Sequence, residues 1–168
     1  RLTVENRVGG GVVSSVWLPS CEAKVPSETR QDFGSWTLEG MDVVIMDDNA
    51  LVRQTLRRLL HADGAIVHEA CHGQEAIDAY RVLLDQGRSA LVILDLVVPD
   101  KVGMGGIETI EQLRTFDPAV RALACSAHCT DQRLQDISTI GFTSFLGKPF
   151  TKQELRDSLM ELSTCEML

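Results

Sequence analysis

The strongest constraint on the fold is a regular alternation of short, continuously apolar runs with amphipathic stretches. Five apolar runs follow one another, at residues 43–46, 65–67, 91–94, 120–125 and 142–146. After each run, apolar residues recur at helical spacing, as in Leu155, Leu159 and Leu162. Strands that are apolar throughout are typical of a sheet buried on both faces. The sequence therefore predicts a doubly wound α/β fold, in which helices cover both faces of a five-stranded parallel sheet.

Local signals mark the last two predicted helices. A short fourth helix is expected around Leu134 and Ile137, ending by Gly141. The final helix is expected to begin at Thr151, because Thr151 and Glu154 form a Thr-x-x-Glu capping box.

Residues 1–40 lack this alternation. A glycine turn at residues 9–11 precedes a short β-prone run that ends at Pro19. Residues 20–40 mix Ser, Glu, Pro, Lys and Gly with little periodicity, as a linker does. The chain also begins with Arg1 rather than Met, which suggests a piece of a longer protein.

Charge and composition exclude several classes of function. The formal net charge is −8, with 24 acidic against 16 basic residues, which argues against nucleic-acid binding. No apolar run approaches the length of a membrane span, so no direct membrane contact is expected of this chain. The five cysteines form no C-x-x-C pair and indicate reduced thiols, and we expect a cytoplasmic location.

Polar side chains follow the predicted strands at the points where those strands end. Asp47 and Asp48 follow the first strand, and Asp95 follows the third. Ser126 follows the fourth strand, and Lys148 the fifth. In a sheet of this kind ligands bind at the carboxyl ends of the strands. These residues are therefore expected to converge on one crevice.

The residue types in that crevice point to phosphoryl transfer. Three carboxylates repel one another, and Mg²⁺, which prefers oxygen ligands, removes the conflict. Lys148 can pair with a phosphoryl group, and Ser126 can donate a hydrogen bond to it. Asp95 is then the expected nucleophile, forming an aspartyl phosphate. The alternative that the acidic residues only cap helices suits Asp48 alone but not the whole set.

Together these motifs resemble the response-regulator receiver domain over about residues 41–163. The resemblance is carried by four motifs: Val44-Ile45-Met46-Asp47-Asp48, Leu94-Asp95 with Pro99 four residues later, Cys125-Ser126-Ala127, and Lys148-Pro149-Phe150. It implies a flavodoxin-like fold with strand order 2-1-3-4-5. It also implies a two-component phosphorelay in which a phosphohistidine donates the phosphoryl group.

The resemblance implies a role for each site residue. Asp47 and Asp48 would hold Mg²⁺ together with Asp95 and the backbone carbonyl of Val97. Lys148 would contact the phosphoryl group, and its bond to Pro149 should be cis.

A switch is also implied by the resemblance. Ser126 would shift towards the phosphoryl group, and Phe145 would turn inward into the vacated space. These shifts would remodel the face built from the fourth helix, fifth strand and fifth helix. The alternative for Phe145 is an ordinary core aromatic, and the sequence leaves both open.

Two features depart from the common receiver pattern. The loop between Pro99 and Gly105 is slightly long and resembles that of receivers attached to sensor kinases. Val97 is apolar and cannot orient an attacking water, whereas His128 can. We therefore hypothesise that Val97 slows self-dephosphorylation.

Two other enzyme classes fit the sequence less well. Residues 68–72 match the H-E-x-x-H string of zinc proteases, but that motif needs a helix, and here it falls on a strand and loop. A haloacid-dehalogenase-like phosphatase would place its nucleophile after the first strand in an Asp-x-Asp arrangement. This chain has Asp47-Asp48-Asn49 there instead.

Residues 1–20 resemble the last glycine turn and final strand of a histidine-kinase ATP-binding domain. We expect residues 1–20 to be a remnant of that domain, 21–40 a linker and 41–168 the receiver of a hybrid sensor histidine kinase. An upstream output domain is the alternative parent arrangement. In either arrangement, we expect this chain to catalyse at most its own phosphorylation and dephosphorylation. Its partners would be a histidine-kinase core or a histidine phosphotransfer protein, and its oligomeric state is left open.

Overall fold

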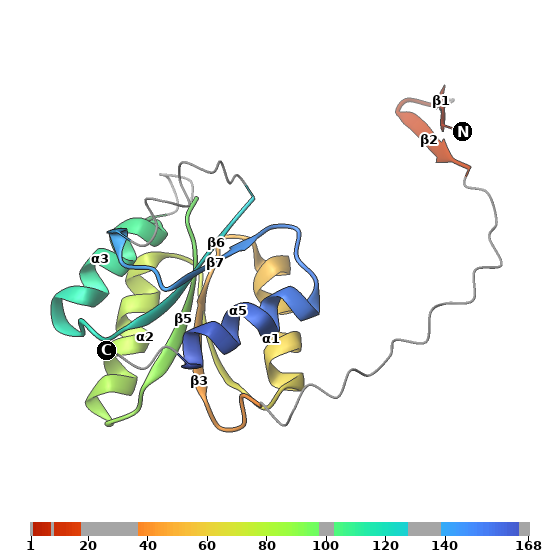
Figure 1. The fold of residues 1–168 in the computed structure, drawn as a ribbon. Helices are drawn as coiled ribbons and strands as arrows, with labels where there is room; N and C mark the ends of the chain where they lie inside the picture. The colour runs from red at the N-terminus through yellow and green to blue at the C-terminus, as the bar shows by residue number, and fades with distance from the viewer. Residues whose placement is uncertain (1, 8, 18–36, 98–102, 128–138, 165–168) are drawn as a thin grey trace. The chain divides into compact units, whose positions relative to one another are not determined.

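The computed structural model describes residues 2–7, 9–17, 37–97, 103–127 and 139–164 (Figure 1). The chain divides into two compact units, Arg1–Ser35 and Trp36–Leu168.

The second unit is built on a parallel sheet. Its strands are β3 (Asp42–Met46), β4 (Ile66–Ala70), β5 (Ala90–Asp95), β6 (Arg121–Ser126) and β7 (Ser144–Gly147). They lie in the order β4-β3-β5-β6-β7, and every neighbouring pair is parallel. Counted from β3, this is the order 2-1-3-4-5, so the predicted fold class and strand order are confirmed.

Helices cover both faces of the sheet. They are α1 (Ala50–Ala62), α2 (Gly73–Asp85), α3 (Gly106–Phe116) and α5 (Lys152–Thr164). The helices α2 and α3 lie on one face, and α1 and α5 lie on the other (Figure 1). The predicted fourth helix falls largely outside the described residues, where only Thr139 and Ile140 of that region are seen to be helical. Within the described ranges, none of the helices is long and apolar enough to cross a membrane.

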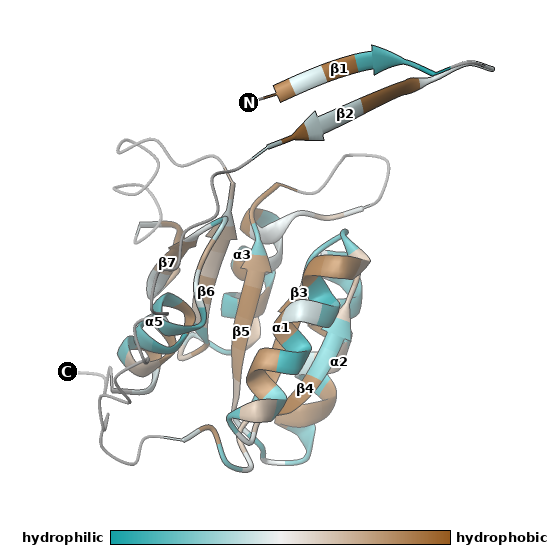
Figure 2. Ribbon diagram, turned by 90° about the vertical axis from the view of Figure 1, so that its right-hand side faces the viewer, coloured by the Kyte–Doolittle hydropathy of each residue, from teal (hydrophilic) through white to brown (hydrophobic). Residues whose placement is uncertain are grey.

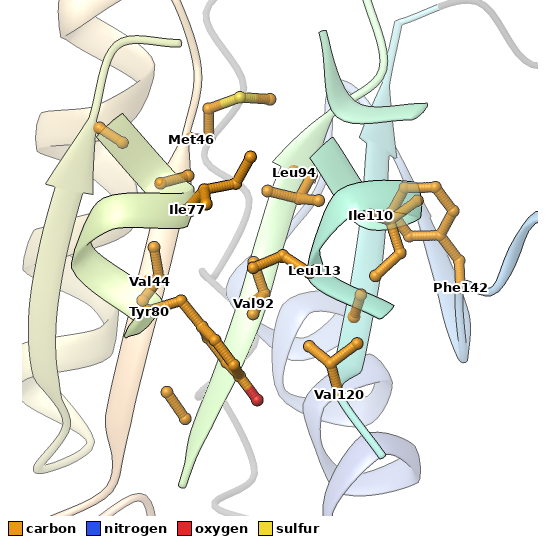
Figure 3. Close-up of a cluster of buried hydrophobic side chains, with 14 of the residues drawn as sticks. Val44, Met46, Ile77, Tyr80, Val92, Leu94, Ile110, Leu113, Val120 and Phe142 are labelled. Carbon is orange, nitrogen blue, oxygen red and sulfur yellow. The ribbon is translucent and has the colours of Figure 1, made fainter. Parts of the chain in front are cut away.

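Alternate residues of each central strand serve two different cores. Val44 and Met46 of β3 face α2 and α3, whereas Val43 and Ile45 face α1 and α5. The first of these, the α2/α3 core, also contains Ile77, Tyr80, Val92, Leu94, Ile110 and Leu113 (Figure 3). Figure 2 shows the central strand β5 hydrophobic along its length. The strands are continuously apolar because both of their faces are buried.

Side-chain caps fix where the helices begin. The Oδ1 atom of Asn49 accepts a hydrogen bond from the Leu51 N–H at 3.0 Å and so caps α1. At α5, the Thr151 N–H donates to Glu154 Oε2 at 2.7 Å, and the Glu154 N–H donates to Thr151 Oγ1 at 3.2 Å. The predicted capping box is therefore confirmed.

The packed structure of the second unit begins before residue 41. Leu38 is fully buried in the core formed with α1 and α5, here called the α1/α5 core. Its N–H donates to the Asp63 carbonyl at 2.9 Å, and the Gly40 N–H donates to the Gly64 carbonyl at 3.0 Å. A single apolar residue in an aperiodic stretch carries no pattern, which is why the sequence did not reveal this contact.

The first unit contains an antiparallel hairpin. Its strands are β1 (Leu2–Asn6) and β2 (Val12–Val16), paired from Leu2 opposite Val16 to Asn6 opposite Val12. The connecting glycines have φ of 98°, 100° and 94° at Gly9, Gly10 and Gly11, values that side chains disfavour. The turn and the β-prone run were predicted, but β1 was not.

Because α1 buries only one of its faces, leucine-to-alanine substitutions at two of its positions should have unequal effects on the free energy of unfolding. Leu60 is 1% exposed within the α1/α5 core, whereas Leu51 on the same helix is 71% exposed. Leu60→Ala should lower the free energy of unfolding by about 2–5 kcal/mol. Leu51→Ala should change it by less than about 0.5 kcal/mol. Urea denaturation of both variants measures the difference, and equal losses would contradict the packing described.

Candidate functional site

The polar residues selected from the sequence meet at one edge of the sheet. Asp47 directly follows β3, and Asp95 is the last residue of β5. Ser126 is the last residue of β6, and Lys148 directly follows β7. Because all of these strands are parallel, their carboxyl ends lie together.

Lys148 connects two of the carboxylates directly. Its Nζ lies 2.5 Å from Asp47 Oδ2 and 2.7 Å from Asp95 Oδ2. The Asp47 side chain is 2% exposed and that of Asp95 is 11% exposed. The Lys148 backbone N–H donates to the Ser126 carbonyl at 2.8 Å, which ties the base of the lysine to β6. One half-buried cation therefore faces two buried carboxylates.

A third carboxylate completes the acidic cluster, which consists of Asp47, Asp48 and Asp95. Each offers an oxygen, and these oxygens lie within 4.8 Å of one another. Asp48 is half-buried, unlike the other two. Three carboxylates face one ammonium group here, so the arrangement retains negative charge. Carboxylate oxygens are the ligands that Mg²⁺ prefers, and the cluster fits a hard divalent cation.

The ionisation of the site follows from burial and from Lys148. Burial raises the pKa of the Asp95 carboxyl above its ordinary value, although hydrogen bonds from Lys148 and the Val97 N–H act in the opposite direction. Burial alone would lower the pKa of Lys148, but hydrogen bonds to Asp47 and Asp95 raise it. The hydrogen bonds thus favour the charged form of Lys148, and a further cation would favour the ionised form of Asp95.

The backbone around Asp47 holds its side chain in place. Its Oδ1 accepts a hydrogen bond from the Asn49 N–H at 2.8 Å. Its carbonyl accepts one from Arg53 Nη1 at 2.6 Å, and its N–H donates to the Ala70 carbonyl at 3.2 Å. With Oδ1 turned to the backbone, Oδ2 is left to face Lys148.

Asp95 is positioned by its own strand end and by the start of α3. Its Oδ1 accepts a hydrogen bond from the Val97 N–H at 3.1 Å. A Cβ on Gly106 would lie 2.5 Å from the Asp95 carbonyl oxygen, so α3 begins directly against the backbone of Asp95. No role was predicted for Gly106 from the sequence, where the Gly105-Gly106 pair is the signal that could have indicated it.

The other predicted site residues that the structure describes lie in, or shortly after, β5, β6 and β7. Ser126 is 1% exposed, and Phe145 is partly buried against the α2/α3 core. The bond between Lys148 and Pro149 is cis, as expected. Val97 is 52% exposed beside Asp95. His128 and residues 98–102 of the long loop lie outside the described residues.

The H-E-x-x-H string does not lie on a helix. His68 and Glu69 belong to β4, whereas His72 lies beyond the strand and caps α2. The Nε2 atom of His68 lies 2.8 Å from Asp42 Oδ1, and Glu69 forms an ion pair with Arg57 at 3.2 Å. The string therefore lacks the helical geometry that a zinc protease needs.

Comparison with solved structures supports the fold. One chain of the crystal structure of the CheX-CheY-BeF3-Mg²⁺ complex from Borrelia burgdorferi superposes with a TM-score of 0.68 at 24% identity. The match covers 75% of this chain and 91% of that one.

Curated sequences show similarity over the second unit and, in one case, over most of the chain. The chemotaxis protein CheY of Halobacterium salinarum is 26% identical over 122 residues, which is 73% of this chain and 96% of that protein. The sporulation initiation phosphotransferase F of Bacillus subtilis is 27% identical, covering 70% of this chain and 89% of that protein. The sensor kinase CckA of Brucella abortus is 26% identical over 166 residues, which is 94% of this chain but 17% of the kinase.

The family model of the response regulator receiver domain matches residues 43–160. This range includes β4, β5, β6 and β7, all of β3 except Asp42, and the whole acidic cluster. The chain therefore belongs to the response regulator receiver domain family, the phosphoacceptor module of two-component signalling.

Proposed function

We propose that Asp95 is the residue that accepts the phosphoryl group. The observation that carries this assignment is the Lys148 ammonium, which contacts both Asp47 and Asp95 at the edge of the acidic cluster. The Lys148 ammonium offsets negative charge from the carboxylates. A phosphoryl group would add further negative charge at the same position, which the ammonium could also offset. Asp95 ends β5, the middle strand of the sheet, with Oδ1 held by the backbone and Oδ2 by the lysine.

The proposed reaction transfers a phosphoryl group from a phosphohistidine. An oxygen of Asp95 forms a bond to phosphorus while the bond between phosphorus and the imidazole nitrogen breaks. The departing imidazole takes up a proton from water. Such transfers depend mainly on positioning and on neutralising charge.

Mg²⁺ is the proposed cofactor, held by Asp47, Asp48, Asp95 and the backbone carbonyl of Val97. When bound, it supplies positive charge to the oxygens of the transferred group. The acidic cluster supports this choice, because its ligand atoms are all carboxylate oxygens within 4.8 Å of one another.

Lys148 and Ser126 are proposed to act on the phosphoryl oxygens. Lys148 can exchange one of its carboxylate partners for a phosphoryl oxygen with little movement, because its Nζ already lies at Asp95. Ser126 ends the strand next to β5 and offers its hydroxyl for a further oxygen. Phe145 on β7 is the proposed second switch residue, and its packing against the α2/α3 core provides the contact that would change.

The surrounding protein is proposed to be a hybrid sensor histidine kinase, with residues 1–20 from the kinase ATP-binding domain, 21–40 a linker and 41–168 the receiver. The match to a sensor kinase over 94% of this chain supports that arrangement, because it extends beyond the receiver. The phosphoryl donor would be the kinase core or a histidine phosphotransfer protein. The name of the similar sporulation phosphotransferase is in keeping with relay chemistry.

Incubation with acetyl phosphate tests the assignment of Asp95. The wild-type protein should gain the mass of one phosphoryl group in the presence of Mg²⁺, and none when a chelator removes the cation. Asp95→Asn should gain none, because its amide is not a nucleophile. Intact-mass measurement and peptide mapping provide the readout.

Asp85→Asn is a matched control, because Asp85 is exposed at the end of α2 and away from the site. It should be labelled like the wild type. Label that persists in Asp95→Asn would contradict the assignment. Release of many equivalents of phosphate per chain would instead indicate a phosphatase.

Replacement of Val97 tests what limits the lifetime of the phosphoryl group. The Val97 side chain is 52% exposed next to Asp95, and it offers no polar atom to orient water. Val97→Asn should therefore accelerate dephosphorylation, since an amide can position a water for attack. The decay of the isolated phosphoprotein measures this effect, with Val97→Ala as the apolar control. An unchanged or slower decay in Val97→Asn would refute the role of Val97.

A further inference from the structure

A second group of potential metal ligands lies between β4 and α2, where it forms no part of the acidic cluster. It consists of Cys71, His72 and Glu75, here named the thiol cluster, each of which offers one ligand atom within 4.8 Å of the others. Cys71 directly follows β4, and His72 and Glu75 stand at the start of α2. The turn of the chain from strand to helix brings the three side chains together.

We propose that the thiol cluster binds a borderline-soft divalent cation, for which Zn²⁺ is the best fit. Zn²⁺ combines cysteine sulfur, histidine nitrogen and carboxylate oxygen in a tetrahedral site, with water able to fill a fourth position. Mg²⁺ favours sites made only of oxygen. The chain would thus carry two cation sites of different chemistry.

The Glu75 carboxylate joins the other two ligands. Its Oε2 accepts a hydrogen bond from the Cys71 N–H at 2.8 Å, and a carboxylate oxygen lies within 4.8 Å of the Cys71 sulfur. Its Oε1 lies 3.7 Å from His72 Nε2. The sulfur and the imidazole nitrogen therefore both lie close to the same carboxylate.

Cation binding requires a defined exchange of protons. The Cys71 thiol proton would leave for the solvent, and the sulfur would bind as thiolate. His72 now accepts a long hydrogen bond of 3.4 Å from the Glu75 N–H through Nδ1. With Nε2 on the cation, the proton of the neutral ring moves to Nδ1 and this cap is lost. A contact of that length contributes little, and the link through the cation would hold the same turn.

The thiol cluster is open to solvent and adjoins the segment after Asp95. His72 is 29% exposed and Glu75 is 50% exposed in their side chains, so a cation has access. A Cβ on Gly103 would lie 3.1 Å from the His72 Cβ, and the Gly73 N–H donates to the Met104 carbonyl at 2.9 Å. A bound cation would therefore stabilise the start of α2 at its contacts with residues 103 and 104.

Titration with Co²⁺, a spectroscopic substitute for Zn²⁺, tests the proposal. The full chain is reduced with a phosphine and kept in excess Mg²⁺, which occupies the acidic cluster. Co²⁺ should then produce the near-ultraviolet charge-transfer absorption that arises only from cobalt bonded to thiolate, and Zn²⁺ should remove it. The band should saturate at one equivalent.

Variants assign the band to its ligands. Cys71→Ala should abolish it, and His72→Gln or Glu75→Gln should weaken Co²⁺ binding by about tenfold or more. Cys125→Ala should retain it, because that thiol is buried in the α1/α5 core. His68→Gln, which alters the other histidine of the H-E-x-x-H string, should also retain it. Circular dichroism confirms that each variant is folded.

Absence of a thiolate band in the wild type would overturn the proposal. So would a band that persists in Cys71→Ala, since it would belong to another cysteine. Neither result would bear on phosphorylation of Asp95, which is read out separately by mass.

Discussion

The Lys148 ammonium, placed between Asp47 and Asp95, is the interaction on which the site depends. It joins the end of β7 to the ends of β3 and β5, which lie on the far side of β6 in the sheet. Three of the five strands must therefore be in register before the site exists. The buried carboxylates would otherwise face each other without compensation, and isolated buried charges are costly.

The groups around Lys148 determine how much negative charge the site retains. One carboxylate oxygen of Asp47 and one of Asp95 are turned to backbone N–H groups, which fixes the oxygens that meet Lys148. Asp48 adds a third carboxylate that is half-buried, so the site keeps an excess of negative charge open to solvent. A divalent cation can offset the negative charge that remains after Lys148 is counted, and the cation and Lys148 can then share the negative charge that a phosphoryl group adds. The same geometry therefore suits a site that takes both.

Two contacts join the segment after Asp95 to the helices on the α2/α3 face. Gly106 lies against the Asp95 backbone, and Met104 accepts a hydrogen bond from Gly73. This short stretch thus lies between the acidic cluster and the thiol cluster. A cation at the thiol cluster would act on this stretch through the contacts of residues 103 and 104 with His72 and Gly73. The two sites are chemically distinct but share this neighbouring backbone.

Much of this arrangement could be predicted from the sequence, because burial on both faces leaves continuously apolar strands. Apolar strands of this kind indicate a parallel sheet, and a parallel sheet brings the carboxyl ends of its strands together. The convergence of Asp95 and Lys148 could therefore be predicted as well. Leu38 was missed because one apolar residue in an aperiodic stretch gives no periodic signal. Gly106 was missed because its role depends on the distance to the Asp95 backbone, which spacing does not encode. The convergence of Cys71 and Glu75 likewise depends on the angle at which β4 leads into α2.

Magnesium affinity in a Lys148 variant tests the central claim most directly. If Lys148 is the cation that balances Asp47 and Asp95, Lys148→Met should bind Mg²⁺ about tenfold or more tightly, because a repelling positive charge is gone. The same variant should accept phosphoryl groups more slowly, since it has lost a partner of the phosphoryl oxygens. Lys152→Met is the matched control, because Lys152 pairs with Asp63 at 3.0 Å outside the site. Calorimetric titration that finds equal or weaker Mg²⁺ binding in Lys148→Met would contradict the account.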